Sequence, residues 1–140
     1  MFLGEYFHSL DEKGRVVMPS SFREELKPGC VVTKGQDGQL LIYTPEKFNE
    51  RASEVLAEQP RNRSGRRFAR TVFAGADAVE VLAGGRVKLN GDLRGFAGLE
   101  PSTEVVVLGV LDHIEVWNKD KYLTDRETGD EVYLEEDEED

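Results

Sequence analysis

The chain of 140 residues contains one pattern twice, and this internal repeat restricts its possible architectures. Gly14-Arg15-Val16 returns 71 residues later as Gly85-Arg86-Val87, in each case between short runs of β-prone residues. After an insertion around residues 100–103 the offset becomes 74, so that Tyr43-Thr44 matches Trp117-Asn118. Two copies of about 45 residues are too few for a solenoid, and one copy alone is too small to bury a core. We therefore expect the copies to pack on each other about a pseudo-twofold axis.

The first copy predicts two hairpins, each followed by a helix. Residues 5–10 and 16–18 are β-prone and enclose a charged turn that contains glycine, which predicts the first hairpin. Ser21 and Glu24 fit a capping box at the start of a short helix that Lys27-Pro28-Gly29 ends. The second copy repeats this order of elements.

The second hairpin of the first copy joins residues 30–33 to residues 40–43, and Thr44-Pro45 begins the helix that follows it. The apolar stripe of this helix, which we expect to pack on the sheet, consists of Phe48, Ala52, Val55 and Leu56. A further helix over residues 66–74 ends at Gly75.

These elements predict a β-rich α+β fold made of two pseudo-symmetric hairpin-helix repeats. We divide the chain into a first repeat (1–59), a linker with an arginine-rich helix (60–76), a second repeat (77–124) and an acidic tail (125–140). The tail has ten acidic residues and one arginine, so it carries −9 of the net charge of −10. Because like charges repel and few apolar residues reward ordering, we expect this tail to be disordered. The rest of the chain is nearly neutral, so the overall charge does not exclude DNA as a partner.

The sequence offers little for an enzyme or a membrane protein. The longest apolar run, residues 105–111, is too short to span a bilayer, and the amino terminus lacks the pattern of a secretory signal. Cys30 is the single cysteine, which favours the cytoplasm, and its β-prone surroundings are more typical of a core residue than of a nucleophile. His8 and His113 are far apart in sequence, and no serine elbow, phosphate loop or metal-ligand spacing is present. We expect no catalytic residue, metal, cofactor or small-molecule substrate.

The segment LDEKGRVVMPSSFRE (residues 10–24), preceded by MFLGEYFHS, resembles the amino-terminal repeat of the MraZ family. This family belongs to the AbrB/MazE-like swapped-hairpin transcription factors, whose signature is Asp-x-x-x-Arg followed by an apolar strand and proline. Here these residues are Asp11, Arg15, Val16 to Met18 and Pro19. The resemblance covers about residues 1–125.

Further along the chain the resemblance is partly kept and partly lost. Residues 66–76 (RRFARTVFAGA) resemble the arginine-rich helix of the family. In the second copy Leu82 stands where the first has Asp11, and Asn90-Gly91 replaces the proline. Either the glycines hold the second turn without a carboxylate, or this turn has lost part of its recognition role.

The resemblance implies one swapped-hairpin barrel with flanking helices. It also implies a nucleoid-associated regulator of the division and cell-wall gene cluster, which binds repeated elements of double-stranded promoter DNA as a homo-oligomeric ring. The alternative is an oligomeric protein-interaction scaffold without specific DNA binding.

The candidate DNA contacts are basic residues near the two turns. An arginine at the tip of a narrow β-ribbon can bridge phosphates or place its fork on guanine in the major groove. Arg15 is the first candidate and Arg86 its symmetry-related partner, while Lys13 suits a phosphate. Arg23 and Arg94 lie on the short helices, where they reach flanking phosphates or are simply solvated.

Other residues have structural or interface roles in this interpretation. Asp11 accepts hydrogen bonds from the turn or pairs with the neighbouring arginine, and Gly14 and Gly85 provide the backbone freedom of the turns. The densest basic cluster consists of Arg61, Arg63, Arg66, Arg67 and Arg70. It pairs with acidic groups of a neighbouring subunit at an oligomer interface, pairs with the acidic tail of the same chain, or contacts DNA.

Overall fold

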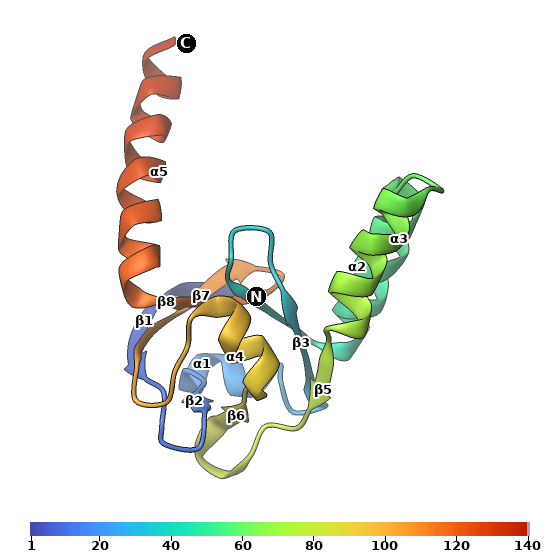
Figure 1. The fold of residues 1–140 in the computed structure, drawn as a ribbon. Helices are drawn as coiled ribbons and strands as arrows, with labels where there is room; N and C mark the ends of the chain where they lie inside the picture. Colours follow the sequence, from blue (N-terminus) through green and yellow to red (C-terminus); the bar gives the residue numbers. More distant parts are fainter. Residues whose placement is uncertain (140) are drawn as a thin grey trace.

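The computed structural model of the protein describes residues 1–139, with side chains as far as Glu136. In chain order the elements are β1 (Phe2–Ser9), β2 (Arg15–Val17), α1 (Ser20–Arg23), β3 (Cys30–Lys34), β4 (Leu40–Tyr43), α2 (Pro45–Glu58), α3 (Arg63–Ala69), the π-helical turn η1 (Arg70–Ala74), β5 (Asp77–Val79), the short helical turn η2 (Ala83–Gly85), β6 (Arg86–Lys88), α4 (Gly91–Ala97), β7 (Glu104–Leu111), β8 (Ile114–Asn118) and α5 (Lys119–Glu139). The expected mixed α+β, strand-rich fold is confirmed (Figure 1).

Strand pairing joins the two copies. The larger sheet is antiparallel with the order β1-β7-β8-β4-β3-β5, and β2 pairs separately with β6. Strands β3 and β4 form a hairpin within the first copy, as predicted, and β7 and β8 form the equivalent hairpin in the second. All other described pairings run between copies. If each strand is replaced by its equivalent in the other copy, the same strand order is obtained in the reverse direction. This symmetry indicates a pseudo-twofold axis.

The register locates this axis. Val16 lies opposite Val87 in the β2–β6 ribbon, and Leu41 lies opposite Glu115 where β4 meets β8. These partners are separated by 71 and 74 residues, which are the two offsets of the sequence repeat. The axis therefore passes between the two central strands of the sheet and through the ribbon.

The expected hairpin between residues 5–10 and 16–18 is wrong. Strand β1 instead pairs along all eight residues with β7, and the three residues of β2 pair with β6. An isolated two-stranded hairpin is marginal in water, whereas the cross-copy pairing buries Phe2, Val16 and Val87 almost completely. The interaction with the other copy therefore overrides the local turn.

The main core lies between the sheet, the ribbon and the short helices α1 and α4. Phe22 of α1 packs edge-on against Phe2 and Tyr6, with ring centres 5.1 and 5.4 Å apart. Leu93 of α4 is buried at the position equivalent to Phe22. Both short helices thus close the same core from symmetry-related places. The capping box expected at Ser21 is wrong, because α1 follows Pro19 and has no side-chain cap.

Helices α2 and α3 form a hairpin that projects from the sheet (Figure 1). Thr44 caps α2 as predicted, and its hydroxyl accepts a hydrogen bond from the amide of Lys47 at 3.2 Å. The prediction that α2 packs on the sheet is confirmed for its first turns, which contact β3 and β4 and where Phe48 packs against Tyr43 with ring centres 6.1 Å apart. Phe48 also contacts Phe73 of η1, and Leu56 further along the helix is 57% exposed.

The acidic segment 125–140, expected to be disordered, continues helix α5 as far as Glu139, and Asp140 lies outside the described residues. The base of α5 is anchored. Tyr122 packs on Trp117 and donates a hydrogen bond to Glu5, and Arg126 forms an ion pair with Glu5 at 2.7 Å. Because glutamate propagates a helix well once a first turn is held, this anchor accounts for the difference.

Candidate nucleic-acid interface

The β2–β6 ribbon presents a basic outer edge. Within residues 15–17 and 86–88, Val16 and Val87 point into the core, so their neighbours along each strand face outward. Arg15 lies opposite Lys88, and Val17 lies opposite Arg86. Two arginines and one lysine therefore share the exposed face, and the pseudo-twofold axis relates Arg15 to Arg86. The ribbon lies at the bottom of the molecule in Figure 1, away from the free ends of α5 and of the α2–α3 hairpin.

Asp11 shapes the first turn and orients its arginine. One carboxylate oxygen accepts hydrogen bonds from the amides of Lys13 and Arg15 at 2.9 and 2.8 Å. The other accepts one from Nε of Arg15 at 2.7 Å. These bonds, chiefly the one from the Arg15 amide, lower the pKa of Asp11 below its usual value. The two contacts that the sequence left open for Asp11 occur together, and they hold the Arg15 guanidinium while the arginine side chain stays partly exposed.

The second turn is held differently. The backbone hydrogen bonds of the two turns are equivalent: the Leu82 amide donates to the Arg86 carbonyl as the Asp11 amide donates to that of Arg15, and in each turn the glycine amide donates back to the first residue. Gly85 has the same φ as Gly14, 77°, but Gly84, at the position equivalent to Lys13, also has a positive φ of 76°, so a second glycine closes this turn in place of the carboxylate. Among the described side chains no acid pairs with Arg86, and its guanidinium has only a weak contact of 3.5 Å with the Ala83 carbonyl. Arg86 is therefore the less restrained of the two arginines.

Arg23 and Arg94 lock the turns of the opposite copies. Nε of Arg23 donates to the Met18 carbonyl at 3.1 Å, and Nε of Arg94 donates to the Leu89 carbonyl at 3.0 Å. Each guanidinium lies against the turn glycine of the other copy. A Cβ on Gly14 would stand 2.6 Å from Nε of Arg94, and a Cβ on Gly85 would stand still closer to Nε of Arg23. Both arginines thus fix the ribbon while they stay partly exposed beside it.

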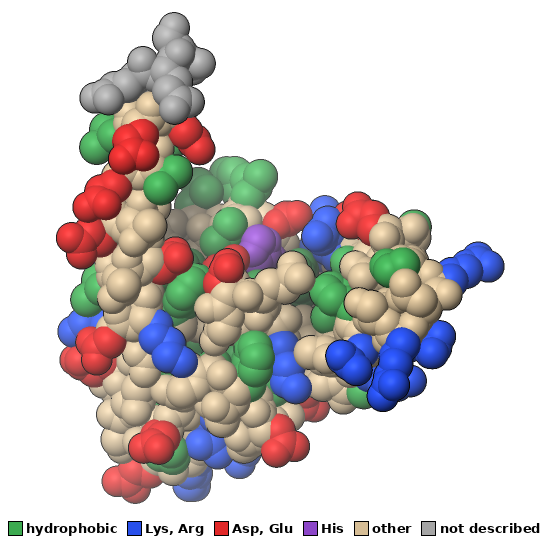
Figure 2. Space-filling view, turned by 45° about the horizontal axis from the view of Figure 1, so that its top comes forward, with side chains coloured by type: hydrophobic (Ala, Val, Ile, Leu, Met, Phe, Trp, Pro, Cys, Tyr) green, Lys and Arg blue, Asp and Glu red, His purple; other side chains and the backbone are tan. Residues whose placement is uncertain are grey.

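The arginine-rich cluster lies elsewhere. Its five arginines are exposed, and Figure 2 shows basic side chains gathered on the α2–α3 hairpin. Helix α3 starts earlier than predicted, because the Asn62 side chain caps it by accepting from the amide of Gly65 at 3.0 Å. Arg66, Arg67 and Arg70 are therefore carried away from the ribbon on a separate projection.

Lys88 was missed by the sequence analysis. The available signal was strand alternation, since Lys88 is two residues after Arg86 and faces the same way. It completes the basic edge directly across from Arg15.

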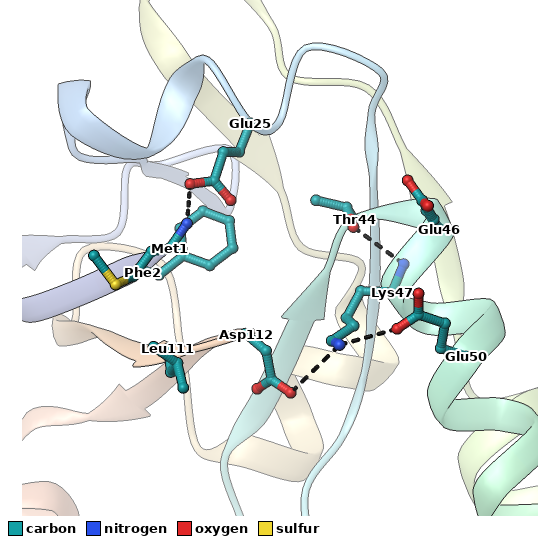
Figure 3. A pocket seen from close by; sticks show the side chains of 9 residues that line it. All are labelled: Met1, Phe2, Glu25, Thr44, Glu46, Lys47, Glu50, Leu111 and Asp112. Carbon is teal, nitrogen blue, oxygen red and sulfur yellow. Dashed lines mark hydrogen bonds and ion pairs between the residues drawn. The ribbon is translucent and has the colours of Figure 1, made fainter.

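An acidic hollow beside the amino terminus is unsuited to phosphate. It has a volume of about 380 Å³, and Glu25, Glu46 and Glu50 contribute carboxylates to it (Figure 3). Lys47 is already paired there with Glu50 at 2.9 Å and with Asp112 at 4.0 Å. This hollow therefore offers no free cation to an anion.

The described residues provide no arrangement for metal or thiol chemistry. They contain no group of three or more histidine, cysteine, aspartate or glutamate residues that could hold an ion. Cys30 is buried, and this burial raises the pKa of its thiol to about 11. His113 lies between Asp112 and Glu115, each 2.8 Å from one ring nitrogen. Within residues 1–139, no helix has both the length and the apolar composition of a membrane span.

Comparison with known proteins identifies the family. The sequence model described as "MraZ protein, putative antitoxin-like" matches residues 1–71 and again residues 72–139. This chain belongs to the MraZ family. Each of the two ranges matched by the MraZ model contains one copy of the repeat.

Curated relatives agree with the MraZ assignment. A protein of Rhodococcus jostii (strain RHA1) is 41% identical over 133 residues, which cover 95% of this chain and 92% of the relative. One of Corynebacterium diphtheriae is 44% identical over 118 residues, covering 84% and 81%. One of Corynebacterium kroppenstedtii is 42% identical over 122 residues, covering 87% and 84%. All three are named "Transcriptional regulator MraZ", which is a regulator rather than an enzyme.

Proposed function

We propose that this protein is a sequence-specific, DNA-binding transcriptional regulator that reads DNA with the β2–β6 ribbon. The observation that carries the proposal is the basic edge of this ribbon, with Arg15, Arg86 and Lys88 facing outward and Lys13 in the adjoining turn. The names of the relatives support a regulatory role.

The ribbon has the shape and the groups that base recognition needs. A two-stranded ribbon enters the major groove, where the fork of an arginine matches the two acceptors of guanine. Asp11 restrains the Arg15 fork, which reduces the entropy lost on binding. Lys13 and Lys88 are compact charges on flexible stems and suit phosphates.

Because of the pseudo-twofold axis, one chain presents two related arginines for contact with DNA. Arg15 and Arg86 lie on either side of the axis that passes between Val16 and Val87. One chain therefore resembles a dimer of a simpler reader, and its target contains two related base steps. The inequality of the turns, Asp11 in one and Leu82 in the other, makes Arg15 the more selective contact and Arg86 the more adaptable one.

The wider interpretation follows from family membership. The exchange of strands between copies supports a swapped-hairpin barrel, in which the two repeats interlock. The regulator is cytoplasmic, associates with the nucleoid and acts on the division and cell-wall gene cluster. It binds promoter repeats as a homo-oligomeric ring, because several weakly bound subunits gain from a raised effective concentration.

The test is fluorescence anisotropy with the DNA upstream of the gene and a scrambled duplex, at two salt concentrations. We expect salt-dependent binding to the upstream DNA, with Arg15→Ala and Arg86→Ala each reducing affinity by about 1–3 kcal/mol. Lys27→Ala removes an exposed cation that lies outside the ribbon and its turns and pairs with Glu24, and it is the matched control. Equal binding to both duplexes, or an unaffected Arg15→Ala variant, contradicts the proposal.

The second candidate is a protein-interaction scaffold without specific DNA binding. The long acidic helix α5 and the loss of the second turn's aspartate favour it. In that case Arg15→Ala leaves DNA binding unchanged and weakens capture of an acidic protein.

A further inference from the structure

Among residues 1–136, whose side chains the structure describes, two oppositely charged surfaces have no partner. One is the set of five exposed arginines in residues 61–70, a segment without any acid. The other is the outer part of α5, where residues 125–136 contain six carboxylates and one arginine. Among the side chains that the structure describes, no ion pair involves these five arginines or any carboxylate of α5.

A basic groove with an apolar floor adjoins the arginines. It has a volume of about 530 Å³ and lies between α3, η1, α4 and the loop after β3. Phe68, Val72 and Phe96 form its floor, and Phe96 is 39% exposed. Lys34 lies 5.5 Å from the centre of the Phe96 ring, and Arg67 also lines the groove. No carboxylate lines the groove, so it suits an apolar segment flanked by acids.

The outer part of α5 contains such a segment. Val132, Tyr133 and Leu134 are 45%, 73% and 63% exposed, and glutamates precede and follow them. Consecutive residues of an α-helix point in different directions, so these side chains spread around α5 rather than forming one face. Three large apolar side chains that stay this exposed gain nothing from the fold of one chain, and such exposure marks interaction surfaces.

The two surfaces cannot meet within one molecule. Helix α5 packs its first turns on β7 and β8 at one side of the sheet, and the α2–α3 hairpin leaves it near β3 and β5. Figure 1 shows both projecting from opposite flanks of the molecule. Their partners therefore belong to different copies.

We infer that the outer end of α5 docks into the groove beside α3 of a second copy of this chain. Tyr133 and Leu134 fill the apolar floor, and Glu135 and Glu136 pair with arginines of the cluster. Because the two surfaces differ, the contact is heterologous, and its repetition closes a ring or continues as a filament. The ribbon lies on the other side of each subunit and stays free. The inference rests on the proposed function in one respect only, since it specifies how the proposed homo-oligomer forms. Its test requires no DNA.

Charge reversal with mixing tests this contact. Arg66→Glu/Arg67→Glu reverses the groove, and Glu135→Lys/Glu136→Lys reverses the helix end. In sedimentation velocity, we expect each variant alone to raise the dissociation constant of the assembly about tenfold or more. An equal mixture presents complementary surfaces again and restores association to within about threefold of the unmodified protein.

Two further variants separate charge from packing and from general effects. Tyr133→Ser/Leu134→Ser alters only exposed side chains, so it leaves the fold intact and weakens association. Lys27→Glu/Lys121→Glu changes the same number of exposed charges away from both surfaces and leaves association unchanged.

Four results overturn the inference. These are an unmodified protein that stays monomeric, reversed variants that associate normally, a mixture that does not recover, and an Arg66→Glu/Arg67→Glu variant that loses only DNA binding. The last result makes the cluster a nucleic-acid contact. A ribbon variant that loses DNA binding but still assembles separates the failure of one proposal from that of the other.

Discussion

Replacing Gly14 with alanine tests whether Arg94 locks the turn of the opposite copy. Gly14 has a φ of +77°, where alanine costs about 1–2 kcal/mol. The added Cβ would stand 2.6 Å from Nε of Arg94. Arg94 must move and gives up its hydrogen bond to the Leu89 carbonyl, worth about 1 kcal/mol. We therefore expect Gly14→Ala to lower the free energy of unfolding by about 2–3 kcal/mol.

Two other glycines separate the backbone cost from the contact. Gly38 has a φ of +83°, but a Cβ there would meet no atom within 4 Å, so Gly38→Ala measures the backbone cost of about 1–2 kcal/mol alone. Gly95 lies inside α4 with open space around it, and Gly95→Ala raises stability by about 0.5–1 kcal/mol. Arg94→Ala, combined with Gly14→Ala, removes the clash, so the double variant loses less than the sum of the single losses.

The assay is urea unfolding at one fixed protein concentration, followed by the fluorescence of the buried Trp117. Thermal unfolding of Gly14→Ala shows a fall in Tm of about 5–10 °C. If Gly14→Ala loses no more stability than Gly38→Ala, or if the losses from Gly14→Ala and Arg94→Ala simply add, the proposed lock is refuted.

Four further predictions concern single side chains. Asp11→Asn destabilises the first turn at neutral pH. Because the pKa of Asp11 is lowered in the folded protein, the carboxylate loses its stabilising effect as the pH falls. In unfolding experiments at acid pH, the stability difference between the variant and the unmodified protein therefore disappears. The hydrogen bond to Glu115 raises the pKa of His113 above its usual 6.5. His113→Gln therefore lowers stability at mildly acidic pH, and this loss becomes smaller as the pH rises through the raised pKa. An NMR titration of His113 that shows a pKa at or below 6.5 contradicts this prediction. Cys30, with a pKa of about 11, resists iodoacetamide at pH about 8 until the protein unfolds, which intact-mass spectrometry measures. Lys88→Ala reduces the salt slope of DNA binding by about one, whereas binding that keeps its full slope argues against a phosphate contact.

Local features of the fold were predictable from neighbouring residues. The β3–β4 hairpin joins adjacent β-prone runs, and α2 begins at a Thr-Pro pair that signals a helix start by itself. The repeat offsets of 71 and 74 also required only the sequence, and the strand register reproduces them. Each of these features depends on residues close in the chain or on a direct comparison of its two halves.

The partners of β1 and β2 could not be predicted in this way. Both strands are adjacent in sequence and fit a hairpin, but each gains more buried surface by pairing with the other copy. Helix α5 shows the same limit, since its first turns are anchored by Glu5, which is more than a hundred residues away. Pattern and propensity do not contain such long-range competition.

The candidate site likewise has one part that could be predicted from the sequence and one part that could not. The spacing of Asp11, Gly14 and Arg15 predicts a turn that carries an oriented arginine, because these residues contact one another within a few positions. The placement of Arg94 against Gly14, and of Lys88 across from Arg15, arises only when the two copies pack about their axis. Short-range hydrogen bonds are specified by residue order, whereas contacts between copies depend on which pairing buries the most apolar surface.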